Sequence, residues 1–218
     1  MDDALINING SDVQTLEIIL MLTLISLIPS ILIMATSFTR IIIVLSIFRN
    51  AIGLQQTPPN MVLISIAIFL TLFVMWPVID EINQSAYQPY VEELITQEEA
   101  LSRAEIPIRE FMLRQTKTDS LNMFIEFADI EVPEELSELP MRIVIPAFMA
   151  SELERAFIMG FLLYLPFLVI DIIVASTLMS MGMIMLPPVM ISLPFKILLF
   201  VVLNGWDLLF MTLVNSFR

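Results

Sequence analysis

The sequence contains no cysteine and no histidine among its 218 residues. Disulfides, thiolate nucleophiles, Ser-His and Cys-His pairs and the usual zinc and haem ligand sets are therefore excluded. Only five residues are glycine, and no phosphate loop of the G-x-x-x-x-G-K-S/T type is present. We therefore expect a protein that is not an enzyme and that uses neither a cofactor nor a metal.

Basic residues are also few, since ten Lys and Arg face 23 Asp and Glu and the formal net charge is −13. The excess is local, because the stretch 80–138 holds 15 acidic and 4 basic residues and carries −11 of that charge. An acidic surface repels a phosphate backbone, so we expect no nucleic acid partner. We interpret this stretch as a separate, solvated subdomain.

Short amphipathic helices are predicted inside the acidic stretch. Ile106–Gln115, with Pro107 near its start, and Asp119–Ala128 each place their apolar residues on one side of a helix. Pro133 and Pro140 then bound one brief acidic turn before the chain becomes apolar again. The stretch is therefore predicted to be helical rather than disordered.

The remainder of the chain is strongly apolar, with 58% hydrophobic residues overall and a mean hydropathy of +0.89. None of its apolar segments alternates with period two, so helices are predicted rather than barrel strands. A helix needs about 20 apolar residues to cross a bilayer. Four segments approach or exceed that length: Leu16–Ser37, Met61–Ile79, Ala156–Leu186 and Val189–Val214. We expect an all-α, membrane-associated protein.

The composition divides the chain into three regions: 1–79, an N-terminal apolar helical hairpin; 80–140, the acidic helical subdomain; and 141–218, a C-terminal apolar helical region. The patch Ile41–Phe48 is interpreted as an extension of the first helix. Arg40 and Arg49 follow the first apolar segment, and such flanks are typically cytoplasmic. This orientation places the acidic region on the extracytoplasmic side.

Features that a simple membrane anchor lacks interrupt these apolar segments. Proline lies within or near the end of each, at Pro29, Pro77, Pro166 and Pro194, and frees backbone groups that protein or water must satisfy. Asp171, Lys196 and Asp207 add charge at or near membrane depth, where burial is costly without a partner. A structural ion pair between Asp171 and Lys196 and a transport role for them are equally open.

A methionine-dense segment, Met179–Pro188, separates the last two apolar segments. Gly182 lies within it and Pro187 and Pro188 close it, which predicts a loop between helices. Methionine is flexible and polarisable, so such a cluster either fills gaps in a core or forms a deformable seal. We call Met179–Leu186 the Met loop.

Several long blocks of the sequence resemble one protein family. They are SFTRIIIVL at 37–45, Arg49, AIGLQQTPPN at 51–60, PAFMASELERAF at 146–157, FLVID at 167–171, LPFK at 193–196 and Gly205-Trp206. In these blocks the chain resembles the FliP family of flagellar and virulence-secretion export-gate subunits. The resemblance covers nearly the whole chain except the acidic region. The sequences of the blocks are more similar to flagellar members than to virulence-secretion members.

The resemblance implies several copies, five in this family, assembled with the Q and R subunits into a helical pore in the bacterial inner membrane, within the flagellar basal body. Unfolded secreted flagellar proteins would cross through this pore, with membrane lipid as a further neighbour. The family also implies that much of the assembly is raised toward the periplasm. In the family, the Met loops of successive subunits form a gasket that closes the pore. The resemblance implies that Met183, Ile184 and Met185 occupy the gasket positions in this chain. Gly182, Pro187 and Pro188 would form the hinge of the loop.

The charged residues of the matched blocks are predicted to be assembly contacts. They are Arg40, Arg49, Glu152, Glu154, Arg155, Asp171 and Lys196. One rival interpretation is an ion- or proton-conducting transporter that uses Asp171 and Lys196 as relay groups. Another is an intramembrane aspartyl protease with Asp171 and Asp207, which lacks the Gly-x-Gly-Asp signature.

Overall fold

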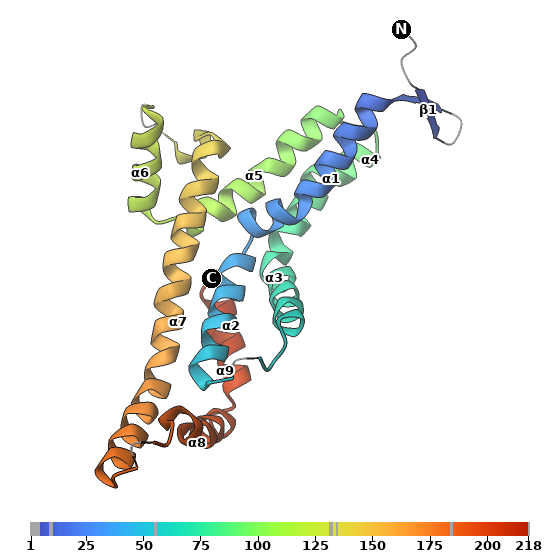
Figure 1. Cartoon of the computed structure of the whole chain (residues 1–218). Coiled ribbons are helices and arrows are strands. Elements are labelled where there is room, and N and C mark those ends of the chain that lie inside the picture. Colours follow the sequence, from blue (N-terminus) through green and yellow to red (C-terminus); the bar gives the residue numbers. More distant parts are fainter. Residues whose placement is uncertain are drawn as a thin grey trace. The chain divides into compact units, whose positions relative to one another are not determined.

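The computed structural model describes residues 5–8, 11–54, 56–130, 133, 135–183 and 185–217 (Figure 1). The chain forms two units, Met1–Met34 and Ala35–Arg218. The first unit contains a short antiparallel hairpin and nearly all of a 21-residue helix: β1 (Leu5–Ile8), β2 (Ser11–Gln14) and α1 (Thr15–Ala35). The hairpin is the one β element among the described residues.

The second unit is helical throughout its described residues, which confirms the predicted fold class. Its elements are α2 (Phe38–Ile52), α3 (Asn60–Ile82), the π-helix η1 (Asn83–Tyr87), α4 (Gln88–Val91), α5 (Gln97–Gln115), α6 (Thr118–Ala128), the 3₁₀ helix η2 (Leu136–Glu138), α7 (Met141–Ser180), α8 (Pro188–Val202) and α9 (Gly205–Asn215). The predicted helix at Asp119–Ala128 corresponds to α6.

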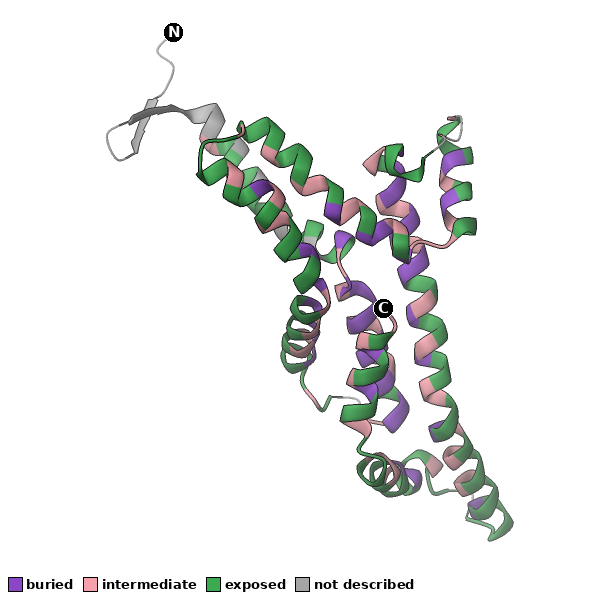
Figure 2. Cartoon of the chain, turned by 180° about the vertical axis from the view of Figure 1, so that it is seen from behind, coloured by how far each residue is buried: buried purple, intermediate pink, exposed green. Residues whose placement is uncertain are grey.

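The centre of the second unit is α2, which packs against α3 and the middle of α7 (Figure 2). Its buried apolar residues recur at helical spacing: Ile41, Val44, Leu45, Phe48, Ala51 and Ile52. Gly160 of α7 allows a close approach, since a Cβ there would meet the Ile47 side chain at 2.5 Å. The blocks SFTRIIIVL and PAFMASELERAF are neighbours in space as well, since Arg40 of the first binds Glu152 of the second.

A second core cluster lies where the acidic region meets the first turns of α7. Leu121 and Ile125 of α6 are buried there, and Met112 of α5 is fully buried. The rings of Phe111 on α5 and Phe148 on α7 meet edge to face, 6.0 Å apart. The amphipathic helices predicted from sequence thus fasten the acidic region to α7.

The start of α5 differs from the prediction that placed it near Pro107. The helix begins at Gln97, because Thr96 and Glu99 form a capping box in which each side chain bonds the other's backbone N–H. Pro107 therefore lies inside the helix, where it removes one backbone donor.

The apolar segments also divide differently from the prediction. Within the described residues two helices are long and apolar enough to cross a membrane, 60–91 and 141–180. The predicted single segment 189–214 is broken into α8 and α9, which meet at 67° and would supply a third span only if the bent pair counts as one. Asn204 causes the break with a left-handed φ of 49°, and Trp206 packs edge to face on Phe200 across it at 5.3 Å.

The first apolar segment is likewise not continuous with the patch 41–48. That patch belongs to α2, a separate helix of 15 residues. A turn at Thr36 and Ser37 precedes it, where the Phe38 amide donates to Thr36 Oγ1 at 3.3 Å. Such local side-chain bonds compete with helix continuation, so the predicted helix extension is wrong.

Candidate functional site

The first two residues of the Met loop, Met179 and Ser180, are the last residues of α7, and a glycine controls the turn that follows them. Gly182 has φ +75°, in the left-handed region. Its amide donates to Met179 O at 3.0 Å, and the Met183 amide donates to Leu178 O at 3.0 Å. This pair of bonds is a Schellman motif, which satisfies the last carbonyls of α7 while reversing the chain.

The far side of the loop is fixed by the two prolines. Pro187 is the N-cap of α8 and Pro188 is the first residue of that helix. Proline fits this position because its fixed φ suits a helix start and its missing N–H is not needed there. Gly182 therefore ends α7 and the two prolines begin α8, and the chain reverses between them at the far end of α7 in Figure 1.

The four methionines described in this loop are exposed and do not pack in the core of the second unit. Met185 is 98% exposed, Met179 and Met181 are each 62% exposed, and Met183 is 42% exposed. Ile184, the middle residue of the predicted gasket, lies outside the described residues. Thioethers presented in this way can make weak, non-directional contacts with whatever faces the loop.

A groove of about 420 Å³ lies between α7 and α8, next to the Met loop. Its lining residues are Ile170, Ile173, Val174, Thr177, Leu178, Ile191 and Phe195. The one hydroxyl among them, on Thr177, donates to Ile173 O at 2.8 Å. The groove thus offers an apolar surface.

Asp171 and Lys196, two charged residues of the apolar segments, are paired within one chain. Lys196 Nζ on α8 lies 2.6 Å from Asp171 Oδ2 on α7 and also donates to Ala51 O at 3.0 Å. Ser192 donates to the other carboxylate oxygen, Asp171 Oδ1, at 2.6 Å. Lys196 is buried and Asp171 is 22% exposed, so the pair ties α8 to α7 and to the end of α2.

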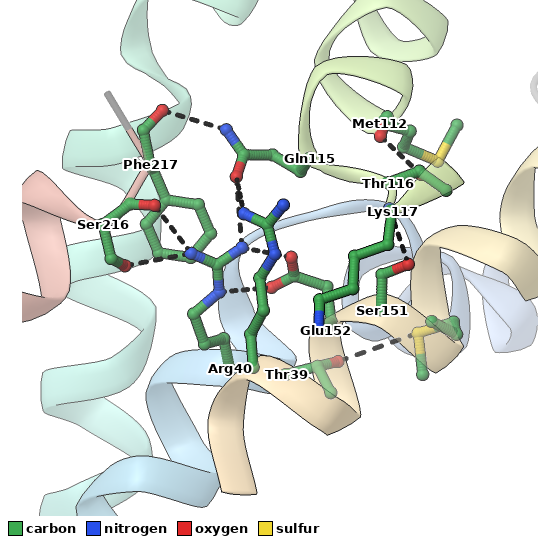
Figure 3. A network of polar contacts seen from close by, with 12 residues as sticks. Thr39, Arg40, Met112, Gln115, Thr116, Lys117, Ser151, Glu152, Ser216 and Phe217 are labelled. Atoms are coloured by element: carbon green, nitrogen blue, oxygen red, sulfur yellow. Dashed lines mark hydrogen bonds and ion pairs between the residues drawn. The ribbon is translucent and has the colours of Figure 1, made fainter. Parts of the chain in front are cut away.

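Arg40 and Glu152 form a second ion pair, fully enclosed by the second unit (Figure 3). The Arg40 side chain is 1% exposed and that of Glu152 is 0% exposed. Arg40 Nε donates to Glu152 Oε2 at 2.9 Å, while Nη2 donates to Oε1. This two-pronged geometry is the strong form of an arginine–carboxylate contact.

The remaining donors of Arg40 reach two further segments. Nη2 also donates to Gln115 Oε1 at 3.1 Å, and Nη1 donates to Ser216 O and Oγ at 2.8 and 3.0 Å. The guanidinium carbon lies 3.8 Å from the centroid of the Phe217 ring. All five N–H donors of Arg40 are thus used, and four segments distant in sequence meet on one side chain.

The other predicted assembly residues lie at the edges of this network or away from it. Arg155 Nη1 donates to Gln115 Oε1 at 3.3 Å, and Glu154 binds Lys117 Nζ at 2.6 Å. Arg49 Nη1 donates to Asn60 Oδ1 at 2.6 Å, across the turn between α2 and α3. These contacts lie within one chain, so the assembly role of the seven charged residues stays a prediction.

Sequence reasoning missed the polar partners that complete both networks. Gln115, Ser192, Ser216 and Phe217 are among them. Ser192 could have been found, because it lies four residues before Lys196 on one helix face. Nothing in the sequence marks Ser216, whose backbone carbonyl is one of the two groups that it offers to Arg40.

Comparison with known proteins identifies the family. A model described as the FliP family matches residues 21–213. Three similar proteins, each named flagellar biosynthetic protein FliP, cover most of both chains. The protein of Aquifex aeolicus is 52% identical over 96% of this chain and 88% of its own, that of Bacillus subtilis is 51% identical over 94% and 92%, and that of Caulobacter vibrioides is 48% identical over 100% and 84%.

Proposed function

The chain belongs to the FliP family, and from that membership we propose that it is a core subunit of the flagellar type III export gate. Flagellar biosynthesis and membrane-length apolar helices support a membrane-associated flagellar component. The observation that carries the finer proposal is the exposed Met loop at the tip of the α7–α8 hairpin. In this proposal the loop lines and closes a channel for unfolded proteins.

The proposed assembly contains several copies of this chain, five by family resemblance, together with the Q and R subunits. It lies in the inner membrane, with the acidic region on the extracytoplasmic side. Many large apolar side chains on α3, α7 and α8 are exposed, including Phe69, Phe161 and Val202. Such surface needs lipid or protein against it, which supports an assembled state.

The sealing mechanism follows from the chemistry of the Met loop. Substrate chains differ in sequence at every step, so a constriction lined by fixed hydrogen-bonding groups would hold some residues and stall. Thioethers make weak, non-directional contacts, and a ring of them excludes water and ions by an apolar constriction. Loops from successive copies can then separate around an extended chain. Gly182 and the two prolines aim each loop.

A transporter that uses Asp171 and Lys196 as relay groups has less support. Lys196 Nζ is held by a carboxylate and a carbonyl, and Asp171 receives bonds on both oxygens. A group held on every side favours a structural pair over a proton relay. Each of these partners also lies in the same chain.

Copurification tests the proposal most simply. Tagged full-length chain, expressed with untagged Q and R subunits and extracted in mild detergent, should retain both subunits in a particle several chains in size. Liposomes that contain the chain alone should show no selective ion flux. A chain that retains neither subunit, yet conducts protons by itself, would replace the gate with the transporter.

A further inference from the structure

The hairpin of α7 and α8 has two apolar surfaces that its own chain leaves uncovered. One is the tip of the Met loop, where Met185 is 98% exposed. The other is the groove of about 420 Å³ next to the loop, where Ile173 on α7 and Phe195 on α8 are both exposed. Adjoining apolar surfaces of this kind mark places where another molecule packs.

The tip of the Met loop does not fill the groove of its own chain. A side chain that is 98% exposed contacts almost nothing in its own chain. The two ends of the loop are fixed as well, by the left-handed turn at Gly182 and by Pro187, the N-cap of α8. The tip and the groove therefore each need a partner from another molecule.

The walls of the groove are joined by an ion pair, so its width is set before anything binds. Two lining residues, Ile170 on α7 and Phe195 on α8, directly precede Asp171 and Lys196 in the sequence. The ion pair between Asp171 and Lys196 fastens one wall to the other. A preformed groove binds a partner without the cost of ordering its own walls.

Charge favours a second copy of the chain as the occupant. Residues 156–206 contain one acidic and one basic residue, Asp171 and Lys196, and these two neutralise each other. Most of the net charge of −13 lies in the stretch 80–138, so two copies repel each other there. The neutral, apolar hairpin is where two copies can meet without that repulsion.

We propose that Met185 of one copy packs into the α7–α8 groove of the next copy, an inference that rests on the proposed assembly of several copies. The two surfaces differ, so the contact is heterologous. Each copy offers its loop to one neighbour and its groove to the other, which builds a ring or a helix of copies. The thioether is held by weak contacts alone, so a passing substrate chain can displace it and the groove can bind it again.

Cysteine cross-linking tests this contact, because the chain has no cysteine of its own. Two full-length copies with tags of different size are expressed together with cysteine-free Q and R subunits. One copy carries Met185→Cys and the other carries Ile173→Cys. A short bifunctional methanethiosulfonate should link the two tagged chains to each other in the purified particle.

Ile172→Cys is the matched control for the groove position. Ile172 and Ile173 are adjacent on α7 and are 57% and 59% exposed, but only Ile173 lines the groove. Adjacent residues on a helix point about 100° apart, so the control should lose the cross-linked product.

Conductance of the assembled gate gives a second readout that needs no introduced cysteine. Ile173→Ser in every copy makes the groove polar, and the loss of one apolar contact surface should weaken the binding of Met185 about tenfold. The gate should then leak ions. Ile172→Ser should leave it as tight as wild type.

Four results would overturn the proposal. Cross-linking of Met185→Cys to itself, in place of Ile173→Cys, would mean that the loops meet tip to tip. Absence of any product would mean that lipid or another subunit covers the groove. Equal products from the Ile173→Cys and Ile172→Cys variants, or a tight Ile173→Ser gate, would mean that the groove takes no part in closure. Each of these results in a particle that retains the Q and R subunits leaves the proposed function standing, whereas a chain that does not assemble with them removes both proposals.

Discussion

Replacing Arg40 by alanine is the sharpest perturbation of the fold, because one side chain joins α2, α5, α7 and the segment after α9. The change leaves the fully buried Glu152 carboxyl without its partner. Removal of one member of a buried ion pair typically costs about 3–5 kcal/mol. For a chain of this size each kcal/mol lowers the unfolding midpoint by roughly 2–4 °C, so we expect a decrease of about 10 °C.

The assay is thermal unfolding of the purified full-length chain in detergent, followed by tryptophan fluorescence. Arg40→Ala and Glu152→Ala should each be strongly destabilised, while the double variant should lose less than the sum of the two, because neither charge is left alone. The exposed pair Lys117–Glu154 provides the control, since breaking it should cost only about 0–1 kcal/mol. Additive losses, or a midpoint within 2 °C of wild type for Arg40→Ala, would refute the reasoning.

Three further outcomes follow from the site. Glu152→Ala should lower the yield of assembled gate on size exclusion with the Q and R subunits; normal yield with lost export would instead give Glu152 a transport role. Replacing Asp171 or Lys196 alone by alanine should destabilise the complex by a few kcal/mol and replacing both should be milder, and strict additivity in that cycle would show that the observed pair contributes no coupling. Gly182→Ala should cost about 1–2 kcal/mol because of its left-handed φ and Gly182→Asn less, as measured by thermal unfolding; equal stability of the three would exclude the turn as a constraint.

Local signals in the sequence were sufficient for much of the fold. Amphipathic spacing predicted α6, and the Gly-Pro-Pro pattern predicted the loop after α7. The start of α5 was also readable, because Thr96 and Glu99 have the spacing of a capping box. The break before Gly205 was not, because a left-handed asparagine has no reliable sequence signal in an apolar run.

Long-range pairing was predictable in one place and not in the other. The unusual position of Asp171 and Lys196 in apolar sequence left an ion pair as one of two open interpretations, and the structure contains that ion pair within one chain. Arg40 and Glu152 are 112 residues apart, and nothing local indicates that their helices cross. Arg40 also binds the backbone carbonyl of Ser216. Every residue has such a carbonyl, so the residue type at position 216 does not predict this contact.

The central claim is that the Met loop seals a pore, and conductance of membranes that carry the purified assembly tests it most directly. The variant replaces Met183, Ile184 and Met185 together by alanine. Its control replaces Met61, Ile68 and Met211, which have the same composition and are exposed away from the loop. Truncation widens an apolar neck, which then no longer excludes water, so the loop variant should assemble normally but leak ions while the control stays closed. A loop variant as tight as wild type would contradict the claim.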